Sequence, residues 1–189
     1  MRKMRFCAVF FAMLLPMILL TACGEKTEGP LNGEWAYIHD TGKTVLELKT
    51  NGKAVYKDTK YSYSTDDSFI KLSGGGEDLN LRYASADEGF YLYEPEVYVY
   101  NGDSAPEGIY GTWIKEDGSW AFEFKKSGEF NEGGVVTFSG HFTEDASNGS
   151  ITLFYSDVFK LDDTVLYLRA EGDKLYVEYP TKMVKTVEQ

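Results

Sequence analysis

The stretch LELKTNG at residues 46–52 and the stretch FEFKKSG at residues 122–128 carry the same pattern of apolar, charged and turn-forming residues. In each stretch, two apolar side chains alternate with two charged ones, and polar residues and a glycine follow. Alternation with a period of two is typical of a β-strand with one buried face, and Asn51-Gly52 is a strong hairpin signal. The sequence therefore predicts the same structure, a strand that ends in a turn, at two places 76 positions apart.

The similarity continues on both sides of these strands. Gly33-Glu34-Trp35 precedes the first stretch, and Gly111-Thr112-Trp113 precedes the second. Further matches follow in the same order, and they pair residues 69–72 with 150–153, 79–82 with 166–169, and 90–95 with 175–180. Internal similarity of this extent indicates a repeated structural unit.

The chain after residue 30 predicts strands and turns. Tyr, Phe, Val and Thr are abundant, Asn-Gly recurs at 101–102 and 148–149, and no stretch there shows a helical period with caps. We expect an all-β protein of roughly fourteen short strands, arranged as two tandem repeats of a small antiparallel β-barrel or sandwich. The alternative is one continuous barrel that is built from two half-barrel repeats.

The expected organisation has five parts. A signal peptide at 1–22 precedes a lipidated tether at 23–30, the first β repeat spans 31–101, a linker spans 102–108, and the second β repeat spans 109–187. Each repeat is expected to fold as a unit of its own, packed against the other.

The first residues have the layout of a secretory signal. A basic start, MRKMR, precedes an apolar run at residues 6–20, which is too short for a membrane span of about 20 residues. Leu20-Thr21-Ala22-Cys23 then resembles the lipobox of bacterial lipoproteins. That resemblance implies cleavage before Cys23, lipidation of Cys23, export, and anchoring to the outer face of the bacterial cell membrane. Lysine outnumbers arginine by 15 to 4, which favours a Gram-positive cell.

Composition after this cleavage excludes one class of partner. The chain from residue 23 has 16 basic and 30 acidic residues, so its net charge is −14. Such a domain is repelled by nucleic acid, and we expect no nucleic-acid role. Cys7 leaves with the signal and Cys23 is the lipidation site, so no thiol remains for a disulfide or a nucleophile.

The Gly-x-Trp at the start of each repeat resembles the lipocalin-like domains of exported bacterial lipoproteins. The resemblance implies a small β-barrel in which Trp35 and Trp113 plug the core. Each repeat is about half of a lipocalin in length, and Arg82 and Arg169 lie in the middle of strands rather than after a final strand.

The residue types that catalysis needs form no recognisable constellation. His39 and His141 are at unmatched positions of the two repeats, and no metal-binding or nucleophile motif is present. The segment that begins at Asp145 departs from a calcium loop and is interpreted as a hairpin turn. We therefore predict no enzyme activity, no cofactor and no metal.

One group of side chains is a candidate ligand site. Tyr91, Tyr93, Tyr98 and Tyr100 flank Glu94-Pro95-Glu96. We interpret Glu94-Pro95-Glu96 as a turn, and a hairpin there would gather the four rings on a platform. The competing interpretation is tyrosine pairing that only stabilises the sheet. The sequence favours a binding module for a small or polymeric ligand; the alternative is an adaptor that contacts another envelope protein.

Overall fold

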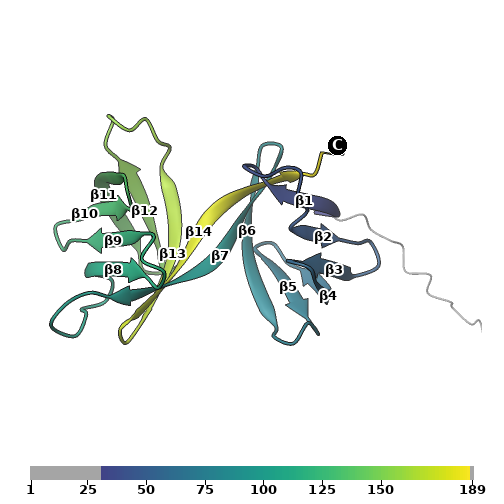
Figure 1. Cartoon of the computed structure of the whole chain (residues 1–189), viewed down its shortest axis with the longest axis horizontal. Helices are drawn as coiled ribbons and strands as arrows, with labels where there is room; N and C mark the ends of the chain where they lie inside the picture. Colours follow the sequence, from purple (N-terminus) through teal and green to yellow (C-terminus); the bar gives the residue numbers. More distant parts are fainter. Residues whose placement is uncertain (1–30, 188–189) are drawn as a thin grey trace, which may run out of the picture.

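The computed structural model describes residues 31–187, and all of the regular secondary structure there is β-strand (Figure 1). The predicted signal peptide and the whole of the predicted tether, Cys23 included, lie outside the described residues. Within the described range, no helix has the length and apolarity that crossing a membrane requires.

The strands are short except for two. Their bounds are β1 Gly33–Tyr37, β2 Leu46–Leu48, β3 Lys53–Tyr56, β4 Thr59–Thr65, β5 Phe69–Ser73, β6 Leu79–Ala86, β7 Gly89–Tyr100, β8 Gly111–Lys115, β9 Ala121–Phe124, β10 Glu129–Gly133, β11 Thr137–Asp145, β12 Ser150–Tyr155, β13 Thr164–Glu171 and β14 Lys174–Lys185. β7 and β14 have 12 residues each.

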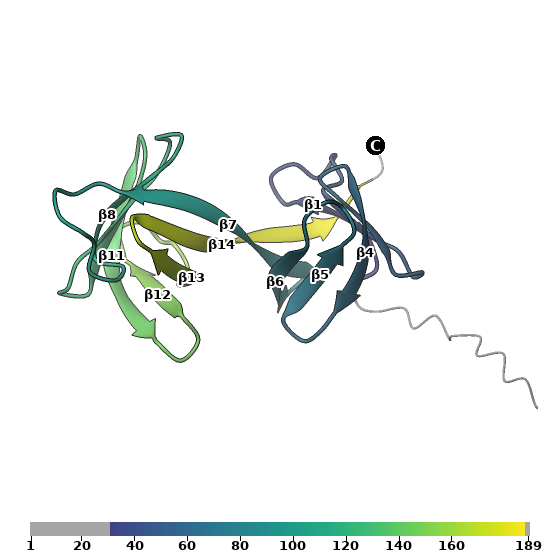
Figure 2. The ribbon, with the colours of Figure 1, turned by 90° about the horizontal axis from the view of Figure 1, so that it is seen from below.

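The strands form one closed antiparallel ring. Each strand pairs with the next along the chain, and β1 pairs with β14. β7 and β14 also pair with each other across the ring, from Lys174↔Val99 to Met183↔Phe90. This pairing makes a two-stranded ribbon with one lobe of strands at each end, as Figures 1 and 2 show. The predicted all-β fold of about fourteen strands is confirmed.

The alternation that predicted strands also defines the interior. Leu46 and Leu48 of β2 are buried, as are Phe122 and Phe124 of β9. The buried apolar side chains form two separate clusters, one in each lobe. The first cluster includes Trp35, Leu46, Leu48, Ile70, Leu72, Phe90 and Leu92. The second includes Trp113, Phe122, Phe124, Phe130, Leu153, Leu166 and Val177.

The two long strands each serve both cores. β7 begins in the first core and ends in the second, where Tyr98 is buried. β14 runs the other way and places Met183 in the first core. The ranges 31–101 and 109–187 thus each receive part of a strand from the other, and residues 102–108 lie in the connection between β7 and β8.

The pairing registers of the two lobes correspond. Trp35 stands opposite Leu46, and Trp113 stands opposite Phe122. Each indole N–H donates to the carbonyl four residues earlier, Trp35 to Leu31 at 2.6 Å and Trp113 to Ile109 at 2.7 Å. Both rings are buried, at 5% and 0% exposure, so both occupy the core positions expected of plugs.

The register corrects one of the matches between the two halves. Ile70 stands opposite Leu81, and Ile151 stands opposite Leu166. Leu81 therefore corresponds to Leu166, and Arg82 corresponds to Tyr167 rather than to Arg169. The match of 79–82 with 166–169 was wrong by two residues, because Leu-x-Leu-Arg occurs in both strands at different distances from the turn.

Candidate functional site

The tyrosine platform does not form. Residues 94–96 are not a turn but lie inside the continuous strand β7, so no hairpin brings the four rings together. Successive side chains of a strand point to opposite faces, and Tyr93 and Tyr98 are five positions apart. Tyr91 is 38% exposed, Tyr93 is 7% exposed and Tyr98 is buried in the second core. Tyr100 packs on Trp113, with 5.1 Å between ring centroids.

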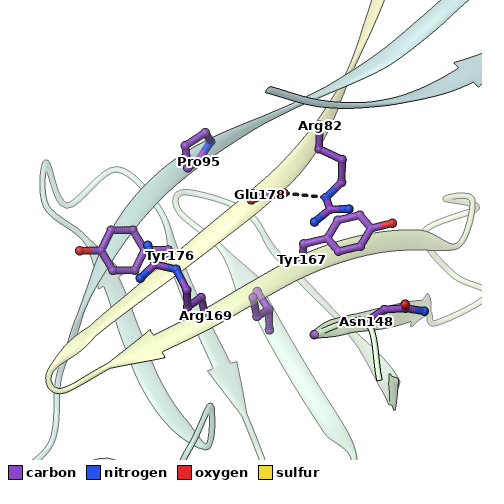
Figure 3. A pocket seen from close by; sticks show the side chains of 9 residues that line it. Arg82, Pro95, Asn148, Tyr167, Arg169, Tyr176 and Glu178 are labelled. Atoms are coloured by element: carbon purple, nitrogen blue, oxygen red, sulfur yellow. Dashed lines mark hydrogen bonds and ion pairs between the residues drawn. The ribbon is translucent and has the colours of Figure 1, made fainter. Parts of the chain in front are cut away.

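A different site lies where the ribbon meets the second lobe. It is a cavity of about 350 Å³ between β6, β13, β14, the middle of β7 and the turn that joins β11 to β12 (Figure 3). Its lining consists of Arg82, Pro95, Asn148, Gly149, Tyr167, Leu168, Arg169, Tyr176 and Glu178. Tyr93 adjoins the site, because its ring packs edge-on against Tyr167 with centroids 5.3 Å apart.

Arg82 is held rigidly at the cavity. Its Nε donates to Glu178 Oε2 at 2.9 Å, a contact that joins β6 to β14 (Figure 3). Its guanidinium carbon lies 3.6 Å from the ring centroid of Tyr167 and 4.7 Å from that of Phe69. Stacking of this kind is a cation–π contact, which is favourable and orients the guanidinium plane. Within residues 31–187 its two Nη groups make no hydrogen bond that meets ordinary geometry.

Arg169 lines the same cavity with more freedom. Its guanidinium lies 4.1 Å from the ring centroid of Tyr176. Its ion-pair partner is Glu171 on the same strand, and both side chains are more than half exposed. Exposed ion pairs contribute little free energy, so Arg169 is available to another partner.

The lining has a definite chemical character. Two arginines and Asn148 supply hydrogen-bond donors, Glu178 and the amide oxygen of Asn148 supply acceptors, and Tyr167 and Tyr176 supply aromatic surface. The ionised side chains of the lining carry two positive charges and one negative charge, in a chain that is strongly acidic overall. This arrangement suits the binding of a polar ligand.

The residues considered for metal or acid–base chemistry do not line this cavity, although Asp145 contacts Asn148, which does. His39 is exposed and stacked on Tyr37, and His141 is exposed and stacked on Phe154. Asp145 accepts hydrogen bonds from Ser147 and Asn148 in the turn that follows it, as a hairpin turn requires. In the described part of the chain, no three His, Cys, Asp or Glu side chains gather as metal ligands.

The middle of β7 supports the first lobe through a carboxylate. Glu94 accepts hydrogen bonds from Tyr37, at 2.6 Å, and from Tyr56, and it pairs with Lys57 at 2.8 Å. Burial alone would raise the pKa of Glu94, but the contacts with Lys57, Tyr37 and Tyr56 outweigh it and lower the pKa. Burial and this carboxylate raise the pKa of both tyrosines.

The second lobe holds a carboxylate, Glu132, whose pKa is shifted in the opposite direction to that of Glu94. Glu132 of β10 is 3% exposed, and it accepts a hydrogen bond from Tyr155. Its Oε2 atom is buried without a partner of good geometry in residues 31–187. Burial raises the pKa of Glu132, and the hydrogen bond from Tyr155 opposes that rise only in part.

The two carboxylates, Glu94 and Glu132, are expected to make stability depend on pH in opposite directions. The folded state lowers the pKa of Glu94 below 4.5, so its stabilising contribution is present above that pH and is lost on acidification. The folded state raises the pKa of Glu132 above 4.5. The contribution of Glu132 to stability is therefore present at low pH and is lost as the pH rises through the pKa of the folded state. At pH 7, Glu94→Gln is expected to cost about 1–3 kcal/mol, and Glu132→Gln is expected to gain about 1 kcal/mol.

Urea denaturation at pH 4 and at pH 7 measures both effects. The gain from Glu132→Gln should shrink at the lower pH, and Glu116→Gln, at an exposed position, serves as the neutral control. A loss of stability in Glu132→Gln at pH 7 would contradict this account.

The cavity is not evident from the sequence. Arg82 and Arg169 appear there only as strand residues, and Glu178 and Tyr176 appear only as parts of a repeat. The signal that was present is rarity: after residue 22 the chain contains only these two arginines. Both of them line this cavity.

Comparisons with known proteins leave the site to be interpreted from its own chemistry. No protein-family model matches the chain, no curated protein matches it, and no solved structure matches it.

Proposed function

We propose that the protein is an exported, lipid-anchored binding module without enzymatic activity, built from a duplicated seven-stranded unit, with the junction cavity as its ligand site. The lipobox-like segment that ends at Cys23 supports export and anchoring. The equivalent registers around Trp35 and Trp113 support the duplication.

The convergence of the two arginines carries the assignment of the site. Arg82 and Arg169 are 87 positions apart, come from strands of different lobes, and still line one cavity, each against a tyrosine ring. Arginine is suited to planar, multidentate recognition. In a chain with so few arginines, the placement of both at one surface hollow favours a recognition role in addition to the structural contacts that Arg82 makes with Glu178 and Tyr167.

The chemistry of the lining favours binding over turnover. It offers donors, acceptors and aromatic surface, which orient a ligand. Among the residues that line the cavity there is no serine, cysteine, lysine or histidine to pair as nucleophile and base.

Native mass spectrometry tests the binding function. Residues 24–189, incubated with an extract of the host, should acquire a discrete added mass, and this mass should be lost in the Arg82→Gln and Arg169→Gln variants. Circular dichroism of the variants controls for folding, and Lys126→Gln, an exposed charge change elsewhere, should keep the ligand. A clean apo mass for the unmodified protein would contradict the proposal.

The anchor has a separate test. Cys23→Ala should release the protein from membranes or leave an unprocessed precursor, because stable anchoring needs acyl chains. Membrane fractionation and intact mass measure this outcome. A fully processed, membrane-bound variant would contradict lipidation at Cys23.

An adaptor function is the alternative, and one surface favours it. Val135, Val136 and Val158 are strongly exposed in the connections that follow β10 and β12. The two connections are joined by a ring contact between residues close to these valines in sequence, Phe138 and Phe159, with centroids 5.3 Å apart. Exposed apolar groups that gather in one place are typical of protein contact sites. Crosslinking on intact cells to one partner, lost in Val136→Ser, would support this function.

A further inference from the structure

Resting on the proposed function of the junction cavity, we propose that its ligand is an acidic saccharide, whose carboxylate or phosphate groups pair with the arginines of the lining, Arg82 and Arg169. The contacts of Arg82 make the first argument. Glu178 occupies its Nε at 2.9 Å, while the rings of Tyr167 and Phe69 fix the guanidinium plane. The Nη groups keep N–H donors that have no acceptor within residues 31–187, so an oriented fork is left for a ligand oxyanion.

The guanidinium group of Arg82 is preorganised, which distinguishes it from an ordinary surface charge. The Arg82 side chain is only 24% exposed, so the protein has already removed most of its conformational freedom. A ligand that pairs with it loses little further side-chain entropy. Lysine would place a flexible point charge there, whereas arginine matches the two oxygens of a carboxylate or phosphate.

Arg169 supplies the second charge. Its ion pair with Glu171 is exposed on both sides, and Glu171 is not part of the cavity lining. Exchange of this weak pair for a ligand oxyanion costs little. With Arg169 released from Glu171, the lining carries a net positive charge inside an acidic chain, and this favours anions over neutral or cationic ligands.

The rest of the lining selects a saccharide among anionic ligands. Asn148 and Glu178 offer both donors and acceptors, as hydroxyl groups require, and Tyr167 and Tyr176 offer flat surface for the apolar face of a sugar ring. The cavity is an open hollow on the surface, and β13 and β14 run along it (Figure 3). A hydroxylated ring that carries an acidic group matches the charge, the hydrogen-bonding groups and the aromatic surface of this lining.

Isothermal titration of residues 24–189 with three probes tests the inference. Trigalacturonate presents carboxylates, glucose 1-phosphate presents a phosphate, and maltotriose is the neutral comparison. At least one acidic probe should bind with a dissociation constant below about 1 mM, and maltotriose should bind at least about tenfold more weakly. The acidic probe that binds more tightly identifies the oxyanion.

Variants at the cavity test the assigned contacts. Arg82→Lys keeps the charge but removes the fork, so it should weaken acidic-probe binding by about tenfold. Glu178→Gln removes the carboxylate that competes for Arg82, so it should strengthen the binding of the acidic probe. A neutral sugar that donates a hydrogen bond to Glu178 would instead bind this variant less well. Lys126→Gln is the matched control, and thermal melts confirm folding of each variant.

The possible results distinguish a failure of this inference from a failure of the proposed binding function on which it rests. Equal binding of maltotriose and the acidic probes, lost on changing Arg82, overturns the acidic class and keeps the cavity as the ligand site. No binding of any probe, together with a discrete ligand mass from the host extract, overturns the saccharide class alone. No probe binding and a clean apo mass overturn both.

Discussion

Residues 31–101 and residues 109–187, produced as separate chains, will not fold as monomers, contrary to the expectation from the sequence that each repeat folds as a unit of its own. In the intact protein, the second half of β14 closes the first lobe between β1 and β7 and brings the buried Met183 to its core. The second half of β7 closes the other lobe between β8 and β14 and brings Tyr98. Each half-chain alone therefore leaves two unpaired strand edges and an opened core, a combination that promotes unfolding or self-association.

Circular dichroism and light scattering of each half, alone and mixed, measure this effect. The halves alone should lack a cooperative melt as monomers, and an equimolar mixture should recover one as a complex. Full-length protein cleaved at a protease site placed within residues 102–108 is the control, because that connection crosses neither core, and it should remain folded. A half-chain that melts cooperatively as a monomer would contradict the exchange of strands.

Local patterns were sufficient to predict the strands and the plugs. The alternation in residues 46–49 and 122–125 predicted which side chains are buried, and the structure buries Leu46, Leu48, Phe122 and Phe124. Periodicity succeeds there because a half-buried strand imposes its period on the sequence directly. The same holds for the tryptophan of each Gly-x-Trp, where a large ring closes a small core.

The prediction of a turn in the middle of β7 was wrong because proline is also a common residue of turns. Pro95 lies opposite Glu178 within the ribbon. The pairing of β7 with β6 ends at Tyr93, and its pairing with β8 begins at Tyr98, so one edge of β7 has no partner strand at Pro95. A strand tolerates proline where an edge is unpaired. Pro180 of β14 lies in the matching gap, between the pairings with β13 and with β1.

The junction cavity depends on contacts that no local pattern encodes. Arg82 reaches Glu178 across 96 positions of sequence, through the pairing of β7 with β14. That pairing is set by the closure of both lobes at once. Sequence composition shows that arginine is rare in this chain, but only the fold shows that both copies after the N-terminal segment meet at one place.

The second large effect is expected at the plug of the second core. Trp113→Ala should lower the free energy of unfolding by about 3–5 kcal/mol, the usual cost of removing a buried tryptophan. The ring is 0% exposed, its N–H donates to the carbonyl of Ile109 at 2.7 Å, and Tyr100 packs edge-on against it at 5.1 Å. Urea denaturation followed by circular dichroism measures the change.

Two further variants separate the causes of that loss. Trp113→Phe keeps an aromatic ring but leaves the Ile109 carbonyl without its donor, so it should cost clearly less than Trp113→Ala. Trp120→Ala removes a ring that is only half-buried and stacked on Phe138 at 6.4 Å, and it should also cost less. Equal losses in Trp113→Ala and Trp120→Ala would contradict the plug, since burial and not ring type is the proposed cause. Because Tyr100 belongs to β7, which also pairs within the first lobe, the Trp113→Ala loss should appear in both lobes as one transition.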